Sequence, residues 1–173
     1  MYKAGLPVLW SSNRKSTFGL TLIELLVTLA ILSILAAAAL PYAELTVRRD
    51  RELELHRDLR EVRSAIDAFR DDWAAGRITH SGDIASPDGY PKKLQVLVAG
   101  VDTGRAGGGK RRYLRRIPRD PFAASATAPP DSQWVQRGYQ DDPDTLTWNG
   151  EDVYDIHSAS DQQAINGTFY RDW

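Results

Sequence analysis

Residues 18–43 read FGLTLIELLVTLAILSILAAAALPYA, and this stretch decides how the chain is organised. From Leu20 to Leu40 every residue is apolar except Thr21, Glu24, Thr28 and Ser33. As a helix, this run would extend about 31 Å, which matches the hydrocarbon core of a bilayer. The stretch therefore predicts a transmembrane helix, in which the carboxylate of Glu24 is costly unless it finds a partner.

Length and composition bound what can accompany this helix. The 173 residues leave room for one modest domain. The chain has no cysteine, which excludes disulfides, thiolate nucleophiles and cysteine-ligated zinc. Its formal charge of −1 does not suit a general nucleic-acid binder, so we expect no nucleic-acid partner. The sequence predicts a membrane-anchored protein with one soluble domain.

The charges beside the apolar stretch predict its orientation. Arg14 and Lys15 directly precede it, which favours a cytoplasmic N-terminus and a C-terminal domain on the far side of the membrane. The basic residues after it are interleaved with acidic ones, as on a solvated helix surface. Two alternatives are a removed signal peptide, whose apolar region is usually only about 7 to 15 residues long, and a plain signal anchor.

The segment RKSTFGLTLIELLVTLAILSILAAAALP, residues 14–41, resembles the prepilin N-terminus shared by type IV pilins and type II secretion pseudopilins. In that family a membrane peptidase cuts after a glycine, the new N-terminal residue is methylated, and the fifth mature residue is glutamate. Cleavage between Gly19 and Leu20 would make Glu24 the fifth residue. It would make Pro41 the twenty-second, where the family commonly has a helix-bending proline. The sequence departs from the family at Leu20, where phenylalanine is usual.

The resemblance implies a division of the chain and a role for the buried carboxylate. Residues 1–19 would be the leader, residues 20–75 a long helix with its transmembrane and filament-core part at 20–40, and residues 76–173 a periplasmic domain. In a polymer, Glu24 would pair with the α-amino group of Leu20 on a neighbouring subunit and set the axial register.

The resemblance also implies partners and a location. The partners would be further copies of the chain, minor pseudopilins, the prepilin peptidase, an inner-membrane assembly platform and the membrane itself. The location would be the bacterial inner membrane, crossed once, with the C-terminal domain in the periplasm.

Residues 42–75 continue the helical pattern and become amphipathic. Apolar residues recur at steps of three and four, at Leu55, Leu59, Val62, Ile66, Phe69 and Trp73. We expect this stripe to pack against the following domain; a coiled coil is the alternative. We also expect Pro41 to bend the helix without ending it, and Gly76 to stop it.

The middle of the chain predicts a short helix and a charged segment. PKKLQVLVAG, from Pro91, suits a helix with Leu94, Leu97 and Val98 inward and Gly100 at its end. Residues 104–110 read GxxxxGK, but arginine follows where a phosphate loop needs serine or threonine, so nucleotide binding is not expected. We expect the bases Lys110, Arg111, Arg112, Arg115, Arg116 and Arg119 to face the acids Asp141, Asp142, Asp144, Glu151, Asp152 and Asp155, within one subunit or between subunits.

The C-terminal part adds a narrower resemblance. YLRRIPRDPF, residues 113–122, is similar to the I/L-P-x-D-P-W/F element of the major pseudopilins of type II secretion. Residues 145–148 and 152–157 alternate and are rich in aromatics, which predicts two strands joined by a hairpin at Asn149-Gly150. The expected fold class is α+β and pilin-like: a long N-terminal helix packed against a small antiparallel sheet.

In the pseudopilin family a C-terminal loop commonly binds calcium through aspartates and carbonyls. The resemblance makes Asp161 one candidate ligand and Asp172 a second, although two carboxylates are few for calcium. The alternative is a loop closed by the aromatic residues Phe169, Tyr170 and Trp173.

Catalysis finds no support in the sequence. The three histidines are far apart along the chain, and no nucleophile or metal-ligand spacing occurs, so we expect no enzyme. The predicted function is structural: a pseudopilin that polymerises into the periplasmic filament of a type II secretion system. The alternatives are a minor type IV pilin and a signal-anchored periplasmic binding module.

Overall fold

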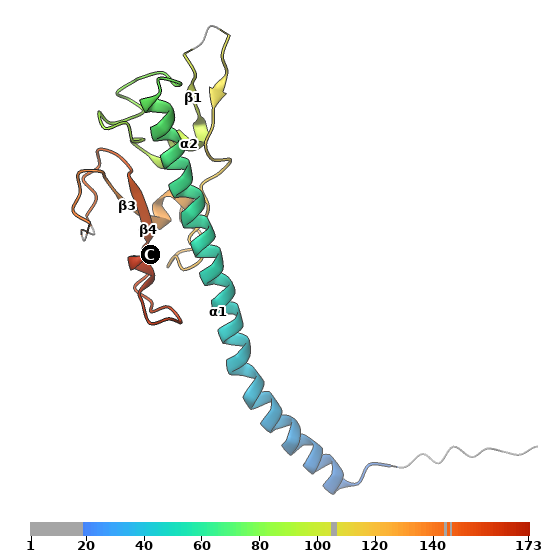
Figure 1. Ribbon diagram of the computed structural model, residues 1–173. Helices are drawn as coiled ribbons and strands as arrows, with labels where there is room; N and C mark the ends of the chain where they lie inside the picture. The colour runs from blue at the N-terminus through green and yellow to red at the C-terminus, as the bar shows by residue number, and fades with distance from the viewer. Residues whose placement is uncertain (1–18, 105–106, 144, 146) are drawn as a thin grey trace, which may run out of the picture. The chain divides into compact units, whose positions relative to one another are not determined.

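The computed structural model describes residues 19–104, 107–143, 145 and 147–173, so the expected leader lies outside the described residues except for Gly19 (Figure 1). The chain divides into two compact units, residues 1–43 and 44–173. The helices are α1 (Leu22–Ala74) and α2 (Leu94–Ala99), with 3-10 turns η1 (Pro130–Gln133) and η2 (Tyr170–Asp172). Strands β1 (Val101–Asp102) and β2 (Lys110–Arg111) form one antiparallel pair, and β3 (Trp134–Arg137) and β4 (Asp155–Ser158) form another.

These elements confirm the expected α+β class, with one long N-terminal helix and small antiparallel sheets. The backbone is helical through position 41, so proline does not end α1 there. The helix runs from Leu22 to Ala74, slightly shorter at both ends than the predicted residues 20–75, and it ends just before Gly76. Gly76, at φ +62°, donates its N–H to the Trp73 carbonyl, and Arg77 donates to the Asp72 carbonyl. These two bonds form a Schellman motif, which satisfies carbonyls that the helix end would leave free.

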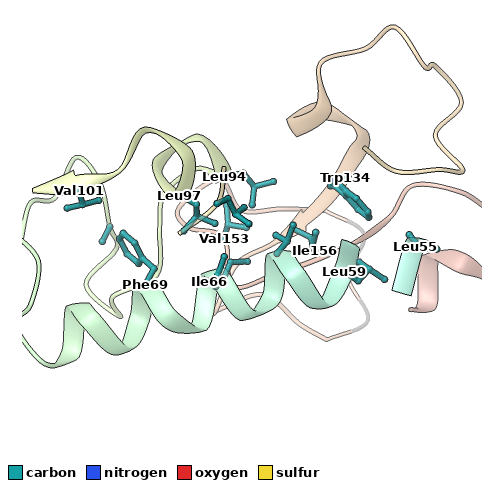
Figure 2. Packing of buried hydrophobic residues seen from close by; sticks show 14 of the residues in the cluster. Leu55, Leu59, Ile66, Phe69, Leu94, Leu97, Val101, Trp134, Val153 and Ile156 are labelled. Carbon is teal, nitrogen blue, oxygen red and sulfur yellow. The ribbon is translucent and has the colours of Figure 1, made fainter. Parts of the chain in front are cut away.

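The apolar stripe of α1 forms the core of the unit at residues 44–173. Leu55, Leu59, Val62, Ile66 and Phe69 are at most 1% exposed, and Trp73 is partly buried. Figure 2 shows side chains of this stripe pointing toward the rest of the core, which includes Leu94, Leu97, Val101, Trp134, Val153 and Ile156. Core packing against the following domain is therefore confirmed, and a coiled-coil partner is not needed to cover the stripe.

Helix α2 is shorter than expected because it begins at Leu94 and not at Pro91. Lys93 is extended, at φ −151° and ψ 149°, and Pro91 pairs with Ala85 in an isolated β-bridge. Gly100 ends the helix as expected, at φ +80°. A Cβ at this position would lie 2.9 Å from the Arg111 carbonyl oxygen, so glycine is needed where β2 passes close by.

The predicted hairpin of residues 145–148 and 152–157 is wrong. Strand β4 begins at Asp155, and its partner is β3, with Trp134 opposite Ser158 and Arg137 opposite Asp155. The described residues of 145–148 form no strand. The Trp148 indole instead donates to the Asp152 carbonyl at 2.5 Å, within the same loop.

The Asn149-Gly150 pair makes a turn inside this long loop. The Asn149 side-chain oxygen accepts the Glu151 N–H at 2.8 Å, and Gly150 has φ +80°. The pair therefore turns the chain as its composition predicted, but the turn does not join two strands.

Candidate functional site: the processing and assembly segment

The predicted cleavage bond lies in exposed backbone before α1. Neither Gly19 nor Leu20 is helical, and Leu20 is 71% exposed. Among the described residues, no atom apart from those of Gly19 and its chain neighbours lies within 4 Å of the position that a Cβ on Gly19 would occupy. The bond between the two residues is therefore accessible in the described chain.

Thr21 caps the start of α1. Its Oγ1 accepts the Glu24 N–H at 3.2 Å, and its carbonyl accepts the Leu25 N–H at 3.1 Å. Glu24 consequently lies in the first turn of the helix, where the helix dipole favours a negative charge. The sequence carries the signal for this cap, a threonine followed three residues later by glutamate before an apolar run. Sequence reasoning did not assign this cap.

The apolar part of α1 is unburied in the isolated chain. Between Leu20 and Leu35 its large aliphatic side chains are 49% to 77% exposed. Within the described residues this stretch is long and apolar enough to cross a membrane. Its two other hydroxyl side chains bond carbonyls of their own helix, Thr28 to Leu25 at 2.9 Å and Ser33 to Leu29 at 2.8 Å. These polar groups are thus satisfied without water.

Two members of the basic and acidic sets, Arg111 and Asp155, pair within the chain with residues outside these sets. Arg111 pairs with Asp72 on α1. Asp155 accepts from Arg63 at 2.7 Å and from Arg137 at 2.9 Å. Asp144 lies outside the described residues. Pairing of these sets between copies of the chain stays a prediction.

Asp72 joins the end of α1 to β2 and the residues after it. Its fully buried carboxylate accepts from Arg77 at 2.5 Å, from the Tyr113 hydroxyl at 2.9 Å, and from Arg111. Burial alone would raise the pKa of Asp72, but the Arg77 and Tyr113 hydrogen bonds and the Arg111 charge together lower it. Burial and the neighbouring Asp72 raise the pKa of Tyr113.

Asp120 holds the IPRDPF element in place. The carboxylate is 4% exposed, and it accepts the Ser158 hydroxyl at 2.6 Å and the Phe122 N–H at 2.8 Å. The Trp134 indole donates to the Pro118 carbonyl at 3.0 Å in the same element. The aspartate of this motif therefore ties the segment to the β3–β4 pair, a role that sequence reasoning did not assign.

The two candidate calcium ligands flank one guanidinium. Asp161 Oδ1 accepts from Arg171 Nη1 at 2.8 Å, and Asp172 Oδ1 lies 3.6 Å from Arg171 Nε. Their side chains are 81% and 57% exposed. Among the described residues, no group of three or more His, Asp or Glu side chains is placed to hold a metal. As arranged, these residues do not fit a calcium coordination set, and calcium binding stays a prediction.

Aromatic contacts close the same loop. Tyr170 is fully buried and stacks on Phe122 with ring centroids 3.9 Å apart. Its hydroxyl donates to Glu52 at 2.8 Å and accepts from Arg48 at 3.1 Å. Burial raises the pKa of Tyr170. The Arg48 hydrogen bond lowers this pKa and the Glu52 hydrogen bond raises it, and the net shift is upward. Trp173 stacks on a histidine of α1 at 4.0 Å. Phe169, in contrast, is 39% exposed.

Comparison with known proteins bears on the N-terminal segment. The family described as the prokaryotic N-terminal methylation motif matches residues 14–40. Comparisons with curated proteins and with solved structures found no match. The matched stretch contains Gly19, Leu20 and Glu24 and most of the apolar part of α1. The chain thus carries the N-terminal methylation motif of prepilin-type precursors, and this motif includes the apolar part of α1, which supports membrane anchoring and a type IV pilin-like family.

Proposed function

We propose that this chain is a pseudopilin of the major type in a type II secretion system. It is cut between Gly19 and Leu20 by a prepilin peptidase and methylated on Leu20. It then polymerises into a periplasmic filament that drives protein export across the outer membrane. The observation that carries this proposal is the methylation motif at residues 14–40, whose apolar helical part is unburied in the described chain. The IPRDPF element favours the major pseudopilins over a minor type IV pilin.

The exposed apolar surface of α1 supports the proposal on physical grounds. Large aliphatic side chains at 49% to 77% exposure are unfavourable in water, at roughly 25 cal/mol per Å² of apolar surface. They are stable in two environments, a bilayer and a bundle of identical helices. The same surface therefore anchors the subunit in the inner membrane before assembly and forms the polymer core after it.

Cleavage would supply a cationic partner for Glu24, whose side chain has none among the described residues. A cut after Gly19 creates an α-ammonium group on Leu20, four residues before the carboxylate. A pair between Glu24 of one copy and Leu20 of the next would offset the cost of burying each charge. The partners of the pathway would be the prepilin peptidase, an inner-membrane assembly platform and minor pseudopilins.

The mature N-terminus tests the processing step. We expect mass spectrometry of the purified protein to find N-methylated Leu20 when a prepilin peptidase is present, and the intact leader when it is absent. A Gly19→Val variant should keep the leader in both cases. An intact Met1 in the presence of the peptidase, or a cut near Ala43, would refute the proposal and favour a plain anchor or a removed signal peptide.

Replacement of Glu24 tests the assembly step. Glu24→Ala should insert into the membrane and be cleaved, yet form no filaments by electron microscopy. Thr28→Ala is a matched control, because the Thr28 hydroxyl bonds only a carbonyl of its own helix. Normal filaments from Glu24→Ala would contradict the pairing. Loss of secretion on deleting the gene, with surface pili unchanged, would separate the pseudopilin from a minor type IV pilin.

A further inference from the structure

We propose that Asn166 is an acceptor for an N-linked glycan. Asn166, Gly167 and Thr168 form the N-x-S/T pattern that N-glycosylation requires. The chain has two other asparagines, Asn13 and Asn149, and these have lysine and glutamate at the position where the hydroxyl residue is needed. The sequence therefore offers one acceptor, and the structure describes its surroundings.

The acceptor lies in an exposed tight turn. Residues 165–169 are all exposed, whereas Ala164 and Tyr170 on either side are buried. The Gly167 N–H donates to the Ala164 carbonyl at 3.0 Å, and the Ala164 N–H donates to the Thr168 carbonyl at 2.6 Å. Gly167 has φ +91°, a conformation that favours glycine. A transferase could thus reach Asn166 without unfolding the packed residues that flank the turn.

Hydrogen bonds fix the direction of the Thr168 hydroxyl. The Trp173 indole donates to Thr168 Oγ1 at 2.7 Å. Because an indole N–H can only donate, the hydroxyl accepts this bond and its own proton points elsewhere. It points to Asn166 Oδ1, which lies 2.8 Å away. The Thr168 N–H donates to the same oxygen at 3.0 Å.

These bonds leave the amide nitrogen of Asn166 available. Both donors of Thr168 bind Oδ1, and in the described part of the chain no hydrogen bond engages Nδ2. An amide nitrogen is a weak nucleophile, because its lone pair is delocalised into the carbonyl. Two hydrogen bonds to that carbonyl draw electron density from the amide and make the Nδ2 protons more acidic. The turn therefore presents the reacting atom and prepares it for deprotonation.

The reaction is a glycosyl transfer without a redox step. The donor is a sugar activated at C1 as a glycosyl phosphate or pyrophosphate, supplied with its transferase by the cell. Asn166 Nδ2 attacks C1, an N–C1 bond forms and the C1–O bond breaks. The phosphate or pyrophosphate leaves with the electron pair, and one Nδ2 proton passes to a base of the transferase. The proposal depends on neither cleavage at Gly19 nor polymerisation.

Peptide mass spectrometry of the full chain, purified from the cells that naturally produce it, tests the site. Chymotrypsin cuts after Trp148 and Tyr154 and so separates Asn149 from Asn166. We expect the Asn166 peptide to carry a glycan, and peptide-N-glycosidase in heavy-oxygen water to convert Asn166 into labelled aspartate. Asn149-Gly150 is the internal control, because spontaneous deamidation would label both Asn-Gly pairs. An Asn166 peptide found only unmodified, or equal labelling of both asparagines, would overturn the proposal.

Variants in the same cells test the role of the hydroxyl. Asn166→Gln and Thr168→Val should abolish the modification, whereas Thr168→Ser should retain it. Trp173→Phe keeps an aromatic ring but lacks the indole N–H, so occupancy should fall although the sequence pattern is intact. Wild-type occupancy in Thr168→Val would refute the role of the hydroxyl, and no modification of the wild type in these cells would refute the acceptor itself.

Two parallel reactions in vitro identify the class of activated sugar that serves as the donor. Purified wild-type chain is incubated with a membrane fraction and a lipid-linked glycosyl pyrophosphate, or with a soluble fraction and a nucleotide sugar. Transfer to Asn166 in one arm assigns the donor class. Transfer in neither arm, with a control acceptor peptide modified in both, would count against the site.

Discussion

Replacing Asp72 by asparagine should remove the charge that joins the end of α1 to β2. Asp72 is fully buried, whereas the side chains of its partners Arg77 and Arg111 are 50% and 49% exposed. The arginines can turn toward water, so each contact should contribute only about 0 to 1 kcal/mol. The Tyr113 hydrogen bond to a buried charge should contribute about 1.5 to 3 kcal/mol. We therefore expect Asp72→Asn to lower the free energy of unfolding by about 1.5 to 5 kcal/mol.

Urea unfolding of the unit at residues 44–173, followed by tryptophan fluorescence, measures this loss. Asp71→Asn is the matched control, because Asp71 is the exposed neighbour and should change the free energy by less than about 0.5 kcal/mol. Equal effects of the two substitutions would refute the assigned role of Asp72.

The pH dependence gives a second, independent check on Asp72. The folded-state pKa of this carboxyl is lowered, so its stabilisation is present above the unfolded-state pKa and is lost as the pH falls through the folded-state pKa. The difference between wild type and Asp72→Asn should therefore be largest near neutral pH and shrink in acid. A difference that stays constant from neutral pH into acid would contradict the charge-based explanation.

The remaining predictions concern the core and the C-terminal loop. Phe69→Ala should cost about 3 to 5 kcal/mol in unfolding free energy, and Leu53→Ala, at a 62% exposed position, less than about 0.5; similar values for both would contradict the core assignment. Tyr170→Phe should cost about 1 to 2 kcal/mol, because its hydroxyl bonds a carboxylate on α1, and no loss would mean that this bond is not stabilising. EDTA should leave the Tm unchanged, because aromatic contacts close the loop; a fall in Tm that calcium reverses would instead show that calcium stabilises the protein and keep Asp161 and Asp172 as candidate ligands.

The helical half of the fold could be predicted because its signals are local. Steps of three and four residues put Leu55 to Phe69 on one face, and burial follows from that periodicity. Gly76 marks the helix end because a Schellman motif needs a residue at positive φ. Such features depend on residues a few positions apart, so one sequence is enough to find them.

The strand pairing could not be predicted because its partner is distant in sequence. Asn149-Gly150 is a strong local hairpin signal, yet β4 pairs with a strand that ends at Arg137. The Arg137–Asp155 ion pair and the burial of Trp134 favour that register, and both are tertiary features. The partners of Asp72 could not be predicted for the same reason, since Arg111 and Tyr113 lie about 40 residues further along the chain.

The same difference between local signals and distant contacts applies to the candidate site. The proposed processing residues Gly19 and Leu20 and the proposed assembly residue Glu24 belong to a contiguous pattern, and the methylation motif at residues 14–40 covers all three. The surroundings of Asp161 and Asp172 depend on tertiary geometry that spacing does not encode. The Arg171 guanidinium bonds Asp161, ten residues earlier in the chain, and no local signal predicts that contact.

The Thr21 cap bears on the energetics of cleavage. A peptide bond inside a helix is held by hydrogen bonds on both sides, and a protease must unwind that turn before it can bind the bond. Thr21 fixes the first helical residue at Leu22, so the bond between Gly19 and Leu20 stays outside the hydrogen-bonded ladder. A peptidase therefore does not have to unwind any turn of α1 before it binds the proposed cleavage bond.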